Sequence, residues 1–374
     1  MESNETKPGV TYSRFWEQFH SGFLILVIIA ALFGNGFVCL AVYKVRQLQK
    51  VSNYFLVSLA VSDILVVLFS VPLRIYFELN EKWELGEHAC KFWIIIDLVC
   101  CTASIVNLAL ISVDRYLALS KSLRYFAIAT VCRCRICIAA VWTFSLAIAL
   151  LSLHTWTGGG GFAHRGQCVK TDKWYYTVIT ILGILIPLIV LIVLYCLVFQ
   201  IAIQQQKKIM TSTHNTPPSS EDGLELRPRS STTTSRRRFA IRELKATKTL
   251  IIVVGAFLIC WLPLFVLLVM QQYVPAYVQS WPPKAQEILG ILFIYTLPQF
   301  NSCLNPYIYT FHNSEFKAVF KTAFSKLLPF MKVRSKNDKH LARLTVDTDF
   351  VSTTELNGVN KQDVYNKLQK IWTV

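Results

Sequence analysis

Residues 89–116 read ACKFWIIIDLVCCTASIVNLALISVDRY, and this stretch decides the fold. The run exceeds the roughly 20 apolar residues that a helix needs to cross the hydrocarbon core of a bilayer. Because a chain in lipid must satisfy its own backbone hydrogen bonds, the stretch is predicted to be a transmembrane helix. Within it, Asp97 and the pair Asp114-Arg115 are candidates for function, since a charge buried in lipid is costly.

Six further segments share this apolar composition, and none has the alternating pattern of a membrane barrel strand. They are 22–43, 54–77, 136–154, 174–200, 247–270 and 286–310. The whole chain of 374 residues has only 16% charged residues and a mean hydropathy of +0.44, whereas soluble domains carry about 25% charged residues. The sequence therefore predicts an all-α membrane protein, a bundle of seven transmembrane helices.

The positive charges of the loops predict the orientation of the bundle. Loops 44–53, 117–135 and 201–245 carry sixteen Lys and Arg residues, and the segments on the other side carry seven. Cations gather on the cytosolic side, so the N-terminus is predicted to be extracellular and the C-terminus cytosolic, in the plasma membrane. Topology and anionic lipid of the inner leaflet explain much of the net charge of +16, which argues against nucleic acid as a partner.

The chain divides into four predicted parts. They are an extracellular N-terminus at 1–21, a transmembrane domain at 22–310, a short amphipathic eighth helix at 311–327 and a cytosolic tail at 328–374. Within the second part, 203–242 is rich in Ser, Thr and Pro and is predicted to be a flexible third cytosolic loop. Asn4 begins a tripeptide, Asn-Glu-Thr, that is either a glycosylation site or a chance match.

Two ionisable sites on one helix favour a signal transducer over an enzyme. Asp97 and Arg115 are 18 residues apart, which is roughly 27 Å of helix at about 1.5 Å per residue. They therefore face opposite sides of the membrane. Every histidine lies in a loop, at the end of a span or in a tail, so neither metal nor histidine catalysis inside the membrane is supported. A transporter remains the alternative from another class, although no internal repeat is visible.

The chain resembles a rhodopsin-like (class A) G-protein-coupled receptor, with matching motifs in every predicted span. These are Gly34-Asn35, Leu59-Ala60-Val61-Ser62-Asp63, Asp114-Arg115-Tyr116, Trp142, Pro187 with Tyr195, Phe257 to Pro263, and Asn305-Pro306-Tyr307-Ile308-Tyr309. Trp93 with the stretch Cys101–Asn107 is most similar to histamine and muscarinic acetylcholine receptors, which belong to the biogenic amine receptors.

The resemblance implies two structural features. A disulfide between Cys90 and Cys168 pins the second outer loop over the ligand pocket. A second group of residues surrounds an allosteric sodium ion or forms a polar network without an ion, and no other cofactor is implied. Its members are Asp63, Ser104, Asn301, Ser302 and Asn305.

The resemblance also implies an activation switch. Arg115 pairs with Asp114 and Glu243 in the resting state, and the pairs break when the sixth helix swings outward; a surface ion pair without a role is the alternative. The other residues of the switch are Tyr116, Tyr195, Pro263, Pro306 and Tyr309. The open state accepts a heterotrimeric G protein, while receptor kinases and arrestin are expected to end the signal.

Asp97 stands where amine receptors pair with a protonated amine, and a carboxylate in a low-dielectric cavity prefers a cation. The predicted ligand residues are Asp97, Thr180, Trp261, Phe265 and Tyr295. Two departures from the family leave the ligand open: Gln299 replaces a tyrosine that bonds the aspartate, and Leu264 replaces an aromatic residue. A small amine is expected, and a peptide, another small ligand or a lost site are the alternatives.

Overall fold

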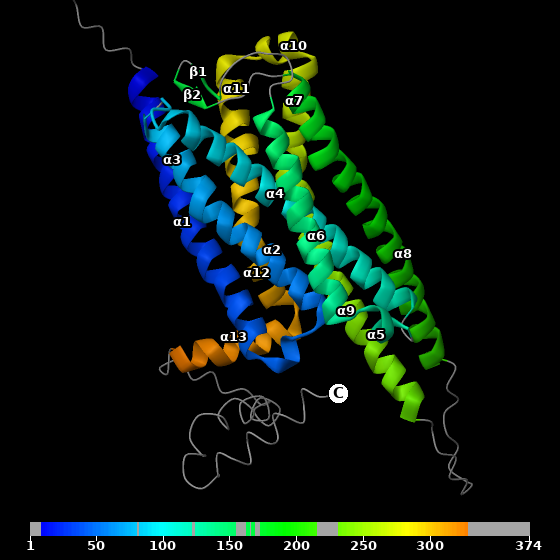
Figure 1. The fold of residues 1–374 in the computed structure, drawn as a ribbon. Helices are drawn as coiled ribbons and strands as arrows, with labels where there is room; N and C mark the ends of the chain where they lie inside the picture. The colour runs from blue at the N-terminus through cyan, green and yellow to red at the C-terminus, as the bar shows by residue number, and fades with distance from the viewer. Residues whose placement is uncertain are drawn as a thin grey trace, which may run out of the picture. The chain divides into compact units, whose positions relative to one another are not determined.

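The computed structural model describes residues 9–80, 82–121, 124–154, 162–164, 166–168, 173–214 and 231–327. By its internal contacts the chain divides into Met1–Lys317 and Ala318–Val374. The first unit is a bundle of helices (Figure 1). In the second unit only 318–327 is described, and it forms the later part of helix α13 (Ser314–Leu327).

Long helical stretches form the bundle, several of them built from more than one element. In chain order they are α1 (Gly9–Lys44); α2 (Val51–Leu65), η2 (Val66–Ser70) and α3 (Val71–Asn80); α4 (Gly86–Ser120); α6 (Val131–Leu150) with η3 (Leu151–Leu153); α7 (Lys173–Val178), η4 (Ile179–Leu185) and α8 (Ile186–His214); α9 (Ser231–Tyr273); and α11 (Pro283–Leu289), η5 (Gly290–Thr296) and α12 (Leu297–His312). The short connecting elements are η1 (Arg46–Leu48), α5 (Tyr125–Ile128), α10 (Pro275–Gln279) and the hairpin β1 (Ala163–His164) and β2 (Gln167–Cys168).

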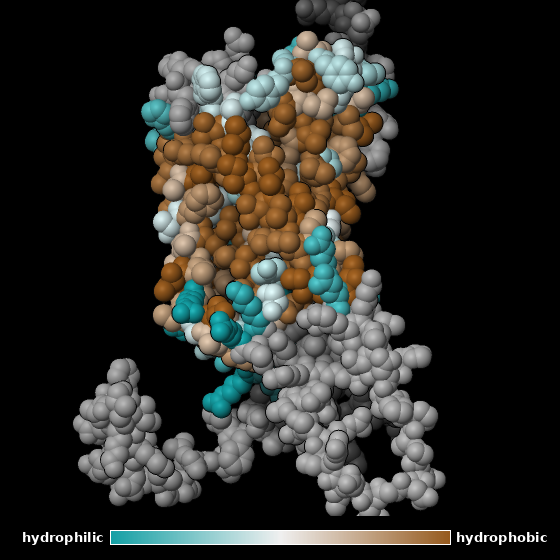
Figure 2. Space-filling view, turned by 90° about the vertical axis from the view of Figure 1, so that its right-hand side faces the viewer, coloured by the Kyte–Doolittle hydropathy of each residue, from teal (hydrophilic) through white to brown (hydrophobic). Residues whose placement is uncertain are grey.

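Six of the described helical stretches are long and apolar enough to cross a membrane. They are Gln18–Lys44, Val51–Asn80, Gly86–Ser120, Val131–Leu153, Ile179–Gln204 and Thr247–Gln271. The seventh predicted span, 286–310, falls on the continuous stretch α11, η5 and α12. On the face shown in Figure 2, hydrophobic residues form a broad band along the bundle, and polar residues gather beyond both of its edges. Outward side chains such as Leu26 and Ile259 are exposed, as expected of residues that face lipid.

The helices extend past the predicted spans. Helix α1 begins at Gly9, inside the segment expected to be an extracellular N-terminus. Helices α8 and α9 continue into the loop predicted at 203–242, so that 215–230 alone lies outside the described residues there. Hydropathy marks where a helix leaves the membrane, whereas polar residues such as Gln and Lys continue it readily in water.

Three π-helical stretches interrupt the described helices, and each lies just before a proline. Stretch η2 precedes Pro72, η4 precedes Pro187 and η5 precedes Pro298. Proline lacks the backbone N–H and clashes with the carbonyl four residues earlier, so the preceding turn loosens. Single π turns of this kind are frequent at functional sites.

Close packing of α1 on α12 fixes the seventh stretch. A Cβ atom on Gly34 would lie 2.5 Å from a ring carbon of Pro306, so only glycine permits this approach. The Asn35 side chain donates hydrogen bonds to the carbonyls of Ala31, at 3.1 Å, and Ser302, at 2.9 Å. Asn35 therefore joins the two helices beside the polar residues of α12.

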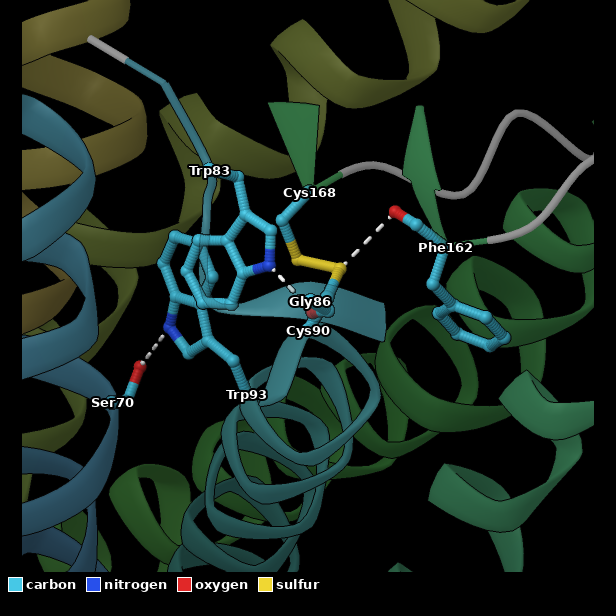
Figure 3. The surroundings of a disulfide bond; sticks show 7 residues. All are labelled: Ser70, Trp83, Gly86, Cys90, Trp93, Phe162 and Cys168. Atoms are coloured by element: carbon cyan, nitrogen blue, oxygen red, sulfur yellow. Dashed lines mark hydrogen bonds between the residues drawn. A yellow bond between two sulfur atoms is a disulfide. The ribbon is translucent and has the colours of Figure 1, made fainter. Parts of the chain in front are cut away.

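The disulfide Cys90–Cys168 attaches the β hairpin to the first turn of α4, with the two Cα atoms 5.5 Å apart. This end of the bundle is called the disulfide end below, and the opposite end, which carries Arg115, is called the Arg115 end. Around the disulfide, Trp83 stacks on Trp93 with ring centroids 5.2 Å apart, and Trp83 Nε1 donates to the carbonyl of Gly86 at 2.8 Å (Figure 3).

Candidate functional site

A small cavity lies between α2, η2, α4, α9 and α12, and two carboxylates line it. Asp97 lies toward the disulfide end and Asp63 lies farther along the bundle. The other lining residues are Val66, Cys100, Cys101, Ser104, Trp261, Pro298, Gln299, Asn301 and Ser302. The cavity has room for about one water-sized group. It therefore joins the predicted ligand carboxylate to the predicted sodium cluster.

A relay of hydrogen bonds orients Asp97. Trp93 Nε1 donates to Ser70 Oγ at 3.0 Å, and Ser70 Oγ donates to Asp97 Oδ1 at 2.8 Å. Figure 3 shows Trp93 lying between its stacking partner Trp83 and Ser70. Ser70 is buried and belongs to η2, so the π turn before Pro72 is the element that carries it. The carboxylate is thus oriented from the second helical stretch.

The other predicted ligand residues divide into those that line the cavity and those that do not. Trp261 lines it and forms a column of stacked rings with Phe257 and Phe265, at centroid distances of 5.8 and 5.7 Å. Phe265 is buried in this column outside the cavity lining. Thr180 is half-buried in η4 and is not part of the lining either. The side chain of Tyr295 lies outside the described residues.

The predicted sodium residues meet around Asp63. Asn305 Nδ2 donates to Asp63 Oδ2 at 2.9 Å, and the hydroxyls of Ser62 and Ser104 are 2.9 Å apart. Ser302 lines the same cavity, and its carbonyl accepts from Asn35. Asn301 Oδ1 is buried with no hydrogen-bond partner among the described residues. Asp63 and Asn301 thus offer oxygen atoms in one cavity.

Three buried polar atoms that line this cavity have no hydrogen-bond partner in the part of the chain that the structure describes. They are Trp261 Nε1, Gln299 Oε1 and Asn301 Oδ1. An unsatisfied buried polar group costs about 1–3 kcal/mol, so such groups are usually paired. Their gathering in one cavity indicates a place for a polar ligand, an ion or water.

At the Arg115 end, Asp114 accepts from two side chains. Arg115 Nε lies 3.1 Å from Asp114 Oδ2, and Tyr125 of α5 donates to Asp114 Oδ1 at 2.8 Å. Both charged residues are buried. Tyr116 follows them and is half-buried. Glu243, the predicted second partner of Arg115, lies in α9 with its side chain outside the described residues.

The remaining switch residues lie in α8, α9 and α12. Pro263 is inside α9 and Pro306 is inside α12. Tyr309 is buried, its hydroxyl has no hydrogen-bond partner among the described residues, and its ring lies 6.4 Å from that of Phe316. Tyr195 stacks on Phe199 in α8, on the surface side of the helix bundle. Asn4, the candidate glycosylation site, is outside the described residues.

A buried network at the disulfide end was missed by the sequence analysis. His20 Nδ1 lies 3.0 and 2.9 Å from the two carboxylate oxygens of Glu78, and His20 Nε2 lies 2.8 Å from Thr296 Oγ1. Arg74 Nη2 donates to Glu78 Oε1 at 3.4 Å. Arg74 lies within the predicted span 54–77 and should have been counted among its intramembrane charges. The partners of His20 are 58 and 276 residues away, so no local pattern indicates them.

Comparison with known proteins decides the family. The sequence model of the family described as 7 transmembrane receptor (rhodopsin family) matches residues 34–309. The chain belongs to this receptor family. The receptor is 35% identical to an alpha-1A adrenergic receptor of Oryzias latipes over 311 residues, which are 79% of this chain and 64% of the relative. It is 33% identical to the 5-hydroxytryptamine receptor 1B of Homo sapiens over 350 residues, which are 82% of this chain and 85% of the relative.

A third relative is the probable G-protein coupled receptor No18 of Amphibalanus amphitrite, 33% identical over 344 residues that cover 82% of this chain and 88% of the relative. The family match confirms the predicted bundle of seven membrane-spanning helices and the relationship to biogenic amine receptors. The receptor is thus a multi-pass membrane protein that acts through G proteins, and it is not an enzyme.

Proposed function

We propose that this receptor binds a small protonated amine at Asp97 and transmits the signal to a heterotrimeric G protein. The observation that carries the proposal is the cavity, which Asp97 lines together with Trp261 and with Gln299, whose amide oxygen has no partner among the described residues. A carboxylate in a water-poor cavity attracts a cation strongly, and an aromatic face adds a cation–π contribution. Relatives named as adrenergic and 5-hydroxytryptamine receptors support this ligand class.

The proposed topology places the disulfide end outside the cell and the Arg115 end in the cytosol of a cell at its plasma membrane. The sixteen loop cations on the Arg115 side against seven on the other support this orientation. The ligand then enters from the side that the disulfide-anchored hairpin covers. Receptor kinases and arrestin are proposed as partners of the Ser- and Thr-rich segments, and anionic lipid as a partner of the loop cations.

Activation is proposed as a shift between two states of α9. The cavity contains Trp261, and the stacked column of Phe257, Trp261 and Phe265 runs along the helix on both sides of Pro263. Because Pro263 removes one backbone hydrogen bond, the helix bends there at low cost. An amine that binds the outward state more tightly shifts the population toward it by that difference in affinity. The pairs around Asp114 then open to admit the G protein.

An allosteric sodium ion at Asp63 is the proposed accessory ligand. Oxygen atoms are the ligands that a hard cation prefers, and the unpartnered Asn301 Oδ1 lines the cavity together with Asp63, Ser104 and Ser302. The residues present therefore fit the ion. Its charge would offset the cost of burying the Asp63 carboxylate in the bundle.

The test is a screen of the expressed receptor against biogenic amines, with G-protein activation as the readout. In parallel, Asp97→Asn removes the charge, and Glu84→Gln makes the same chemical change at an exposed residue between α3 and α4. Activation by an amine that is lost in Asp97→Asn and kept in Glu84→Gln, at equal surface expression, supports the proposal. Activation by a peptide that is indifferent to Asp97→Asn would overturn it.

A further inference from the structure

We propose that the ammonium group of the ligand is shared between Asp97 and Gln299, and that Ser70 positions Asp97. The receptor therefore selects primary and secondary amines and rejects quaternary ammonium. The inference rests on the proposed amine function and narrows its ligand class.

The direction of the relay to Asp97 follows from counting hydrogen atoms. An indole N–H can only donate, so the Ser70 oxygen accepts from Trp93. The single hydroxyl hydrogen of Ser70 is then free to point at Asp97 Oδ1. Trp93 is held in turn by its stacking on Trp83, which is fixed to the backbone carbonyl of Gly86. The relay therefore starts at rigid backbone and ends on one oxygen of the carboxylate.

The second oxygen of Asp97 is left for the ligand. Asp97 Oδ2 has no hydrogen-bond partner among the described residues, and Asp97 lines the cavity. Since Ser70 already performs the orienting task from the second helical stretch, Gln299 is not needed for it. The amide oxygen of Gln299 lines the same cavity, buried and without a partner in the described part of the chain. The cavity thus presents two acceptors.

Two acceptors favour a ligand with two or more N–H groups. A primary ammonium has three hydrogens and can donate to both Asp97 and Gln299, while a tertiary ammonium has one and a quaternary ammonium none. A quaternary group would leave the Gln299 oxygen buried and without a hydrogen bond. A polar site rejects a ligand that leaves its buried groups unpaired, because the unpaired groups cost free energy.

The experiment measures two series of matched probes. They are tryptamine and phenethylamine, each as the primary, N-methyl, N,N-dimethyl and N,N,N-trimethyl form. G-protein activation in cells gives potency, and the thermal shift of the purified full-length receptor reports binding without activation. We expect the primary and secondary forms to bind at least about tenfold more tightly than the tertiary form, with no measurable binding of the quaternary form.

Variants separate the roles of the two residues. Gln299→Met keeps the size of the side chain and removes the acceptor, so it should weaken the primary amine about tenfold and flatten the ranking, whereas Gln299→Glu should keep the ranking. Ser70→Ala should weaken every amine about fivefold without changing the ranking, and Ser70→Thr, which keeps the hydroxyl, should restore affinity. A merely structural role for Ser70 would not be rescued in this way.

The outcomes distinguish the inference from the function on which it rests. Equal binding across a series, or tighter binding of the trimethyl form, overturns the two-acceptor site while leaving an amine receptor. An unchanged ranking in Gln299→Met overturns the role of Gln299. Failure of every probe to bind, together with silence toward all other amines, overturns the amine function and the inference with it.

Discussion

Two buried polar groups of the bundle differ in how completely their hydrogen bonds are satisfied. At the disulfide end, His20 bonds to both Glu78 and Thr296 and so joins α1, α3 and η5. In the cavity, Gln299 and Asn301 each have a buried oxygen without a partner among the described residues. A satisfied network rigidifies a structure, while buried unpaired groups need a partner from elsewhere. The first group, His20 with Glu78, Thr296 and Arg74, is therefore a structural clamp, and the second is a binding site.

Both ring nitrogens of His20 have hydrogen-bond partners. Thr296 Oγ1 donates its only hydrogen to the carbonyl of Ile291 at 2.7 Å, so it must accept from His20 Nε2. His20 Nδ1 faces both oxygens of the Glu78 carboxylate, which also accepts from Arg74. The clamp is therefore the Glu78 carboxylate held between His20 and Arg74.

Removing the shared carboxylate of the clamp should have the largest effect on stability. In Glu78→Ala, Arg74 loses its anion and His20 loses a hydrogen-bond partner in a buried site, and breaking a buried ion pair by removing one partner costs about 3–5 kcal/mol. We expect a clear fall in the thermal midpoint of the purified receptor, whereas Glu84→Ala at an exposed position should change little. Equal midpoints for the two variants would show that the clamp carries no stability.

A pair of substitutions in the seventh stretch sharpens the comparison. Thr296→Val leaves the buried Nε2–H of His20 without its acceptor, at a cost of about 1–3 kcal/mol. Gln299→Met, three residues away, removes an oxygen that already lacks a partner, and it should change stability by less than about 0.5 kcal/mol. Unfolding midpoints of the two variants without ligand give the answer. If Gln299→Met proved the more destabilising, the assignment of clamp and site would be reversed.

The sequence predicted the membrane bundle and much of the cavity, because both depend on local information. Long apolar runs give the spans, and Asp63, Asp97 and Trp261 occupy motif positions whose type alone is informative. The arrangement around them was not predictable. Ser70 reaches Asp97 because the π turn η2, which ends at Ser70 just before Pro72, rotates the side chains along the second helical stretch. Composition does not reveal such a shift by one residue.

The clamp was beyond sequence reasoning for a different reason. Its members come from three distant segments, and histidine and threonine near helix ends are ordinary there. Arg74 and Glu78 did give a usable signal, since they form a charge pair four residues apart at the end of an apolar span. Tyr125 gave none, because an aromatic residue in a short loop helix has many roles.

The unsatisfied oxygen in the deeper part of the cavity predicts a sodium effect. Replacing potassium with sodium in the buffer should lower agonist affinity by at least about fivefold in the unmodified receptor, a coupling near the low end of allosteric effects. Asp63→Asn removes the negative charge next to Asn301 and should abolish the difference between the two salts. Competition binding in matched sodium and potassium chloride measures it. A salt effect that survives in Asp63→Asn would place the ion elsewhere.

The smallest effect is expected at the Arg115 end, because Asp114 accepts from two side chains and keeps one of them when the other is removed. Tyr125→Phe removes one hydrogen bond to Asp114 and leaves the bonds from Arg115, so the cost to the resting state is about 0.5–1.5 kcal/mol. Because this weakens the hold on the Asp114-Arg115 pair, basal G-protein activation should rise a few-fold. Tyr54→Phe is the matched control. Tyr54 is half-buried, and its hydroxyl makes no hydrogen bond within the described part of the chain. A fall in basal activity would mean that Tyr125 supports the active state instead. The hydrogen-bonded groups at the two ends of the bundle would then have different roles. The group around Glu78 would only stabilise the fold, and the contact between Tyr125 and Asp114 would be one that the G protein uses.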